Sequence, residues 1–244
     1  MWNQTSRKDD VEAGKSLLYP LMQESPELRW AFIRKVYSII TLQLLVTIAV
    51  ASVVVTVHPI AAFFTTTWTG RAIYIVIILI PIVVICPLYI YRQKHPMNFF
   101  LLGIFTVGFG FGLGVVCAYY SGKVILETLI LTALLVIGLT LYTFWVAKRG
   151  DDFKFLPAFI FGCLIVLLLF VLIQIFYPLG NLSTTIYGGL VSIIFCAYII
   201  FDTNNLIKRY SYDEYIWAAI SLYLDVLNLF LYLLDVFKAN NTRS

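Results

Sequence analysis

Long apolar stretches recur along the chain, each about the length of one membrane span, with short polar breaks between them. Seven stretches qualify, over residues 36–57, 72–91, 98–120, 124–146, 155–176, 182–207 and 215–237. A helix that crosses the hydrocarbon core needs about 20 apolar residues. Because apolarity is continuous along each stretch, without alternation, the pattern predicts helices and not the strands of a barrel. We therefore predict an all-α polytopic membrane protein, a seven-transmembrane-helix bundle.

The composition agrees with a chain that lies mostly in lipid. Of its residues 61% are hydrophobic and 12% are charged, and the mean hydropathy is +0.91. A soluble domain has about 45–50% apolar and about 25% charged residues. The formal net charge is only +4, so no basic patch predicts a nucleic-acid partner. The four cysteines lie in apolar runs without CxxC spacing, which predicts neither disulfides nor a metal centre, and we expect no resident cofactor.

Three segments are predicted: a mobile cytosolic N-terminal tail over residues 1–35, the transmembrane domain over residues 36–237, and a short C-terminal tail over residues 238–244. Basic residues near the span ends set the orientation. On the side of the N-terminus lie Arg29, Arg34, Lys35, Arg92, Lys94, Lys148, Arg149, Lys154, Lys208 and Arg209, and on the other side Arg71, Lys123, Lys238 and Arg243. The N-terminus is therefore expected in the cytosol. A re-entrant last segment would return Lys238 and Arg243 to the cytosol, but residues 215–237 are long enough to cross.

Four acidic residues fall within the predicted spans: Glu127, Asp202, Asp225 and Asp235. A charge at the bilayer centre costs about 2.5–3.5 kcal/mol even on insertion scales. Glu127 and Asp235 lie near helix ends and are interpreted as interfacial. Asp202 and Asp225 are equally far in sequence from the turn at Asp213-Glu214, so in an antiparallel hairpin they reach nearly the same depth, at most about 17 Å below the surface. We predict that these two carboxyl groups meet.

The last helix supports an inward orientation for Asp225. With each residue advancing about 100°, a polar stripe falls within an arc of about 80°, and it comprises Ser221, Asp225, Asn228, Tyr232 and Asp235. One interpretation is that these polar groups only fix helix packing, at about 0.6 kcal/mol each. We favour a functional pair, because serine or asparagine would be sufficient for packing and would avoid the cost of two ionisable groups.

Two carboxyl groups in contact inside a low dielectric cannot both ionise cheaply, so they share a proton and titrate as a pair. Such a pair senses pH, and when doubly ionised it offers the oxygen ligands that calcium prefers. Candidate supporting groups are Asn205, Asn228 and Ser221, with water and backbone carbonyls. Arg92, at the cytosolic end of the second span, is a candidate latch for the pair. Simple anchoring of the helix by its positive charge explains Arg92 equally well.

The motifs around these residues resemble a known family. Residues 221–230 (SLYLDVLNLF) look like the last-helix signature of the Bax inhibitor / Lifeguard (TMBIM) family. Residues 200–203 (IFDT) match its penultimate helix, and residues 32–37 (FIRKVY) resemble its first. Residues 212–220 (YDEYIWAAI) are most similar to plant Lifeguard members. The resemblance covers roughly residues 28–237.

This resemblance implies a seven-helix bundle that acts as a pH-sensitive calcium leak across an endomembrane (endoplasmic reticulum, Golgi or vacuole) and suppresses cell death. The family's paired aspartates map onto Asp202 and Asp225. In its bacterial branch an arginine of the second helix latches one aspartate, and Arg92 is the nearest match. Residues 89–94 (YIYRQK) lack the arginine cluster of that branch. The implied partners are the bilayer, calcium ions, protons and cell-death regulatory proteins.

Other function classes stay open at this point. The main alternative is a non-conducting membrane adaptor that regulates cell death or stress responses through protein partners. An intramembrane aspartyl protease could use two such acids, but the Gly-x-Gly-Asp context is missing, and the soluble catalytic motifs are absent as well, so no enzyme is predicted. A seven-helix receptor is disfavoured by the short loops and by the lack of a lysine in the last span for a retinal link.

Overall fold

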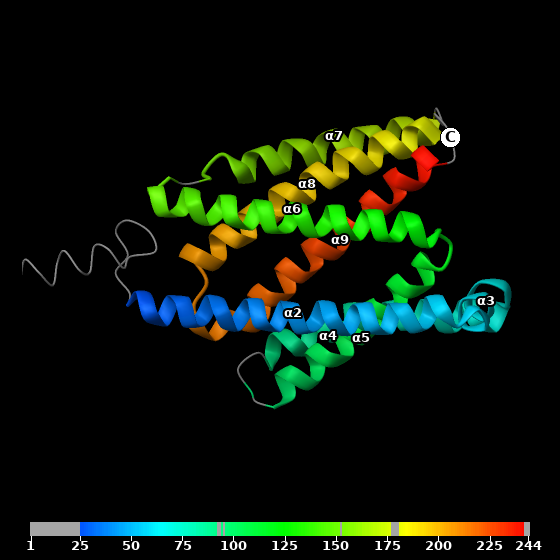
Figure 1. Ribbon diagram of the computed structural model, residues 1–244, viewed down its shortest axis with the longest axis horizontal. Helices are drawn as coiled ribbons and strands as arrows, with labels where there is room; N and C mark the ends of the chain where they lie inside the picture. Colours follow the sequence, from blue (N-terminus) through cyan, green and yellow to red (C-terminus); the bar gives the residue numbers. More distant parts are fainter. Residues whose placement is uncertain (1–24, 92–93, 95, 152, 177–180, 242–244) are drawn as a thin grey trace, which may run out of the picture.

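The computed structural model describes residues 25–91, 94, 96–151, 153–176 and 181–241. That part of the chain folds into α-helices joined by short connections, without strands (Figure 1). The elements are α2 (Pro26–Thr56), α3 (His58–Thr66), α4 (Trp68–Ile90), α5 (Met97–Cys117), α6 (Gly122–Arg149), α7 (Leu156–Phe176), α8 (Asn181–Lys208), the 3-10 turn η1 (Tyr212–Glu214) and α9 (Tyr215–Asn241).

Seven of the described helices are long and apolar enough to cross a membrane, and α3 is the short exception. The long helices run roughly along one axis, and α2 begins at the end of the bundle opposite to the end where α9 finishes (Figure 1). This arrangement confirms the predicted all-α, polytopic fold. All seven predicted spans correspond to a long helix.

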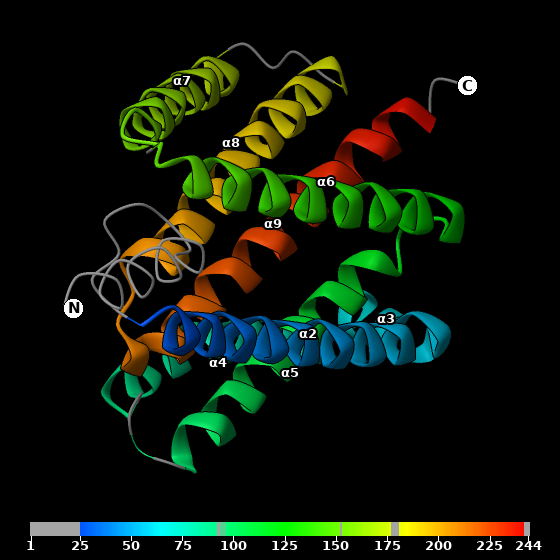
Figure 2. The ribbon, with the colours of Figure 1, turned by 60° about the vertical axis from the view of Figure 1, so that its left-hand side comes forward.

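Helix α9 lies at the centre of the bundle. Helices α2, α4 and α5 pack together with α3 on one side, α6, α7 and α8 form a second group, and α9 contacts α2, α6 and α8. Figure 2 shows α9 passing between the two groups. A residue on α9 can therefore reach helices of either group, so the polar stripe on this helix has neighbours from both.

The first helix begins ten residues earlier than predicted. Pro26 occupies the first turn, where a missing N–H costs nothing, and Glu27 there complements the helix dipole. Residues 26–35 are thus the first turns of α2, and the predicted boundary of the mobile tail at residue 35 is wrong. Residues 1–24 lie outside the described part of the chain. The apolar pattern did not locate the start of α2, because charged residues are frequent in the first turns of this helix.

The connection between the first two spans contains the short helix α3. It packs mainly on α4. The ring of Phe64 lies 5.0 Å from that of Phe111 on α5 in an edge-to-face contact. The sequence pattern missed α3 because nine residues are too few to read as a span, while Pro59 reads as a turn signal although it is well tolerated in a first helical turn.

Glycines on α5 allow α2 to approach closely. A Cβ atom added at Gly114 would lie 2.9 Å from the Cα of Ala51, and one at Gly110 would lie 3.1 Å from the Cα of Thr47. The distance at Gly114 is shorter than real Cβ atoms show to a neighbouring backbone atom. A residue without a Cβ atom is therefore required at this position. By contrast, a Cβ at Gly103 would meet nothing within 4 Å. The GxxxG spacing of Gly110 and Gly114 therefore serves helix packing.

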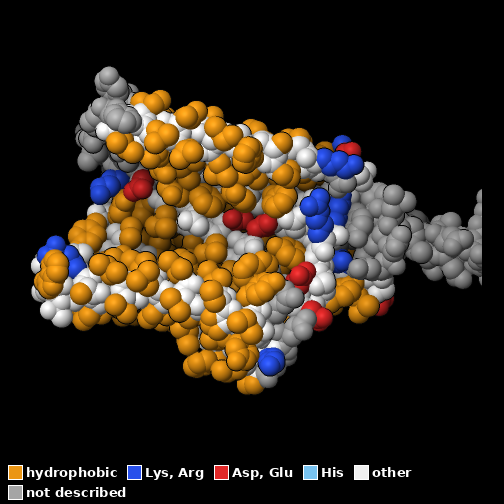
Figure 3. All heavy atoms as spheres, turned by 180° about the vertical axis from the view of Figure 1, so that it is seen from behind, with side chains coloured by type: hydrophobic (Ala, Val, Ile, Leu, Met, Phe, Trp, Pro, Cys, Tyr) orange, Lys and Arg blue, Asp and Glu red, His pale blue; other side chains and the backbone are white. Residues whose placement is uncertain are grey.

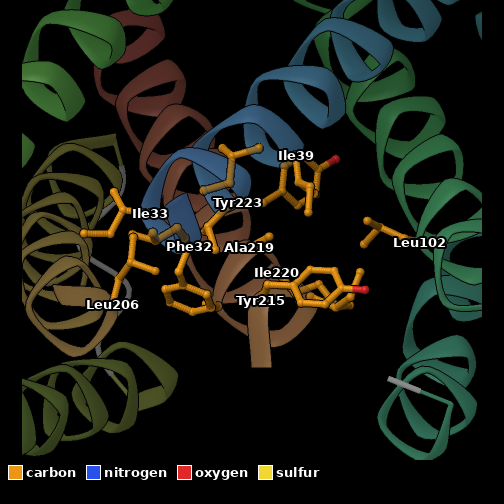
Figure 4. Packing of buried hydrophobic residues seen from close by; sticks show 14 of the residues in the cluster. Phe32, Ile33, Ile39, Leu102, Leu206, Tyr215, Ala219, Ile220 and Tyr223 are labelled. Atoms are coloured by element: carbon orange, nitrogen blue, oxygen red, sulfur yellow. The ribbon is translucent and has the colours of Figure 1, made fainter. Parts of the chain in front are cut away.

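The main core lies around the first half of α9. Tyr223, Ile216 and Ala219 of α9 are fully buried, together with Val36 of α2 and Phe105 of α5. Figure 4 shows side chains from α2, α5, α8 and α9 converging there. The Tyr223 hydroxyl lies 2.7 Å from the Thr47 hydroxyl, which itself donates to the carbonyl of Gln43. Tyr223 is therefore the donor to Thr47, and the core fixes α2 against α9.

Candidate functional site

A tight turn joins α8 to α9 and places the two helices antiparallel. The backbone N–H of Ser211 donates to Oε2 of Glu214 over 3.0 Å, and the two residues form a capping box at η1. This arrangement satisfies backbone groups at the helix start and turns the chain within a few residues. As expected from their equal distance from the turn, Asp202 on α8 and Asp225 on α9 come to the same depth.

The structure brings the carboxyl groups of Asp202 and Asp225 into side-chain hydrogen-bond contact. An ionised carboxylate only accepts hydrogen bonds, so this contact favours a state in which the two groups share one proton. Asp225 is 6% exposed, and Asp202 is half-buried. Viewed from behind, the molecule has acidic side chains in the floor of a hollow between two apolar bands (Figure 3). The geometry fits the shared proton expected from the sequence.

Polar neighbours lie beside the pair on the side of the turn between α8 and α9. The side chain of Asn205, one turn from Asp202, is hydrogen-bonded to the Asp202 carboxyl group. Ser221 is hydrogen-bonded instead to the side chain of Tyr210, at the end of α8. Burial and the nearby charge of Asp202 raise the pKa of Tyr210, which keeps its hydroxyl protonated. Of the three predicted supporting residues, Asn205 contacts the pair directly and Ser221 lies in the adjoining network.

Asn228 does not join this cluster. Its side-chain amide donates over 2.8 Å to the carbonyl of Leu224 in its own helix. The residue lines a different cavity, together with Pro81 of α4 and Gly108 of α5. It was predicted to support the pair because it shares an arc of the helix with Asp225. The arc is wide enough, however, for its two edges to face different neighbouring helices. Arg92, the candidate latch, lies outside the described residues.

A cavity of about 360 Å³ adjoins the pair. Residues of α7, α8 and α9 line this cavity. They are Leu164 and Leu167 of α7, Tyr187, Val191, Ile194, Phe195 and Tyr198 of α8, and Asp225 and Tyr232 of α9. Tyr198 interacts electrostatically with both carboxyl groups. Oδ2 of Asp225 has no hydrogen-bond partner among the described residues. One face of the pair therefore borders a mostly apolar space.

Sequence reasoning treated Arg29 only as an anchoring charge, whereas the structure buries it. Arg29 is 3% exposed, and its Nη1 donates over 2.6 Å to the carbonyl oxygen of Tyr210. Its guanidinium also lies 5.1 Å from the ring of Tyr212. Arg29 thereby connects α2 to the turn that carries the Asp202 and Asp225 helices. The residue lies three positions before the buried Phe32, a helical spacing that would have indicated its inward orientation.

The other two acids lie near the opposite end of the bundle. Oδ1 of Asp235 accepts a hydrogen bond of 2.5 Å from the Tyr120 hydroxyl, and the Lys238 ammonium lies 4.6 Å from the Tyr120 ring. Burial, reinforced by this hydrogen bond, raises the pKa of Tyr120. Glu127 lies 3.8 Å from Lys123, and both side chains are largely exposed. Neither acid joins the Asp202 and Asp225 pair.

No group of three or more potential metal-ligating side chains occurs within the described residues. The pair offers at most four carboxylate oxygens, whereas calcium takes 6–8 oxygen ligands. Asn205 is the nearest further side-chain ligand. A calcium ion at the pair would therefore need several water or backbone ligands.

Comparison with known proteins gives the family. Residues 29–242 match the family described as "Inhibitor of apoptosis-promoting Bax1". The chain belongs to this Bax inhibitor family. It is 66% identical to Lifeguard 2 of Arabidopsis thaliana over 239 residues, covering 98% of this chain and 99% of that protein. These matches confirm the resemblance found in residues 200–203 and 221–230.

More distant members extend beyond plants. The chain is 33% identical to lifeguard 4 of Mus musculus and 34% identical to the Golgi anti-apoptotic protein of Vaccinia virus (strain Lister). Both matches cover 98% of this chain and 96% of the relative. The Bax inhibitor match includes both Asp202 and Asp225. The description of the family names an inhibitor and no catalysed reaction.

Proposed function

We propose that this Bax inhibitor family member is a pH-sensitive calcium leak channel of an endomembrane, gated by Asp202 and Asp225. The observation that supports it best is the hydrogen-bonded carboxyl pair within the spans, with Asp225 only 6% exposed. Carboxyl groups are costly at this depth, and packing does not need two of them. The cost is understandable if the pair binds protons and cations.

The shared proton links α8 to α9 in the closed state. Loss of that proton leaves two negative charges in contact at low dielectric, which repel each other and favour separation of the helices. The ionised oxygens then become ligands for calcium, so protons and calcium compete for the pair. Acidification closes the pathway, and higher pH opens it. The hollow with acids in its floor (Figure 3) is the proposed route to the pair.

Suppression of cell death is the proposed cellular consequence. It is supported by the description of the family and by the name of the viral relative, an anti-apoptotic protein of the Golgi. That name also favours an endomembrane location. In the proposed orientation the N-terminus is cytosolic, because most basic residues at span ends lie on that side. The turn with Asp213 then faces the cytosol.

The direct experiment is calcium flux into liposomes that contain the purified full-length protein and a calcium dye. We expect flux above that of protein-free liposomes at neutral pH. Glu127→Gln is the matched control, since this exposed acid lies far from the pair, and it should conduct like the wild type. A folded protein that gives no flux above lipid alone would contradict the channel and favour a non-conducting adaptor.

A further inference from the structure

The cavity of about 360 Å³ beside Asp225 has a chemical character that calcium conduction does not explain. Most of its wall is apolar. The aliphatic side chains that line it are Leu164, Leu167, Val191 and Ile194, and the aromatic rings are those of Tyr187, Phe195, Tyr198 and Tyr232. The rings are mutually packed: Phe195 and Tyr232 stack at 5.8 Å, and Tyr187 meets Tyr232 edge-on at 6.1 Å. Such a lining is typical of sites for organic ligands.

One carboxyl group, that of Asp225, borders this mostly apolar space. Oδ2 of Asp225 lacks a hydrogen-bond partner among the described residues, although Asp225 is only 6% exposed. A buried polar atom left without a partner costs about 1–3 kcal/mol, and more if it is charged. An occupant that donates a hydrogen bond to this oxygen would remove that cost. The cavity therefore favours a donor at one end and an apolar body at the other.

The charge of the pair defines the ligand further. Two carboxyl groups that share one proton have a single negative charge, which one monovalent cation balances. An ammonium group supplies both the positive charge and the N–H donor that Oδ2 lacks. Aromatic rings near a desolvated ammonium add cation–π attraction. An anion would be repelled, and a neutral donor would leave the negative charge unbalanced.

We propose that this cavity binds a small hydrophobic ammonium ion, with its N–H on Oδ2 of Asp225 and its apolar group against Leu167, Val191 and Ile194. The site uses the carboxyl pair but does not depend on calcium conduction. Calcium itself fits the cavity poorly, because hydrocarbon and aromatic walls supply few of the oxygen ligands that the ion needs.

The test measures binding of benzylammonium to the full-length protein in lipid nanodiscs, without calcium, by calorimetric titration against empty nanodiscs. Benzyl alcohol is the neutral probe of similar shape. We expect saturable benzylammonium binding that is at least about tenfold tighter than that of benzyl alcohol, because only the cation forms the charge-assisted hydrogen bond. Equal binding of the two probes would overturn the proposal, since it would indicate partitioning by hydrophobicity alone.

Three variants complete the test. Asp225→Asn should weaken benzylammonium binding at least about tenfold, while Asp235→Asn, on the same helix but outside the cavity, should bind like the wild type. Leu167→Trp fills the cavity from α7 without touching the carboxyl pair, so it should abolish binding even if Asp225→Asn fails to fold. Unchanged affinity in Leu167→Trp would overturn the site. A protein that binds benzylammonium but conducts no calcium would contradict only the proposed channel.

Discussion

The guanidinium of Arg29 donates a 2.6 Å hydrogen bond to the carbonyl of Tyr210, so the first span is tied to the turn between the last two. That turn determines how α8 and α9 approach each other and hence how Asp202 meets Asp225. Tyr210 itself interacts electrostatically with both carboxyl groups. Tyr210 therefore lies between Arg29 of α2, which binds its carbonyl, and the two carboxyl groups, which act on its side chain.

This connection predicts the effect of Arg29→Met. Loss of a buried hydrogen bond from a charged group should lower the free energy of unfolding by about 1.5–3 kcal/mol, measured by denaturant titration in detergent. Arg34→Met is the matched control, because Arg34 is on the same helix but exposed, and it should behave almost like the wild type. Equal losses in the two variants would show that Arg29 acts only through its charge.

The close approach of α2 and α5 predicts opposite outcomes for two glycines of one helix. Gly114→Ala introduces a methyl group 2.9 Å from the Cα of Ala51, and we expect a loss of about 1–3 kcal/mol from overpacking. Gly103→Ala meets open space and should be neutral or stabilising by up to about 1 kcal/mol, because alanine favours helix. Thermal unfolding of both variants checks this. Similar melting temperatures for the two would contradict the packing described for α2 and α5.

At the opposite end of the bundle, the hydrogen bond from Tyr120 to Asp235 predicts that Tyr120→Phe destabilises the protein by about 1 kcal/mol. The exposed neighbour Tyr119 provides the control variant Tyr119→Phe, which should have little effect. Because the pKa of Tyr120 is raised on folding, its contribution is fully present below the unfolded pKa of about 10 and is lost as pH rises through the folded pKa.

Unfolding of the wild type and Tyr120→Phe should therefore be compared at neutral pH and above about pH 10. We expect the difference between them to persist up to the unfolded pKa and to shrink only at higher pH. A difference that disappears already below about pH 9 would contradict the raised pKa of this phenol.

The proposed topology predicts the location of both chain ends. Helix α9 has 27 residues, and at 1.5 Å per residue it spans about 40 Å, more than the hydrocarbon thickness of about 30 Å. A glycosylation acceptor on a spacer after Ser244 should be modified in the secretory pathway, and an N-terminal tag should stay accessible from the cytosol. A C-terminal reporter that is unmodified and accessible from the cytosol would contradict the seventh crossing.

Much of this arrangement could be predicted from sequence, for identifiable physical reasons. Span length and continuous apolarity are set by the bilayer, so all seven long helices were found. Asp202 and Asp225 could be paired because a short turn between antiparallel helices fixes the depth of residues at equal separation. The sequence could not show which helices lie next to each residue. Asn228 shares an arc of α9 with Asp225, but only the packing of α4 and α5 shows that Asn228 faces away from the carboxyl pair. The buried role of Arg29 was missed for the same reason, since charge near a span end looks like anchoring.

The central claim is that Asp202 and Asp225 act as one titrating unit that gates calcium. The most direct measurement is calcium flux through proteoliposomes between about pH 5 and pH 8, for the wild type, Asp202→Asn, Asp225→Asn and the double variant. The account predicts that each single variant loses most of the pH dependence and that the double variant adds little, because either substitution removes the shared proton. Additive effects of the two substitutions, or a wild-type pH profile in either single variant, would contradict it.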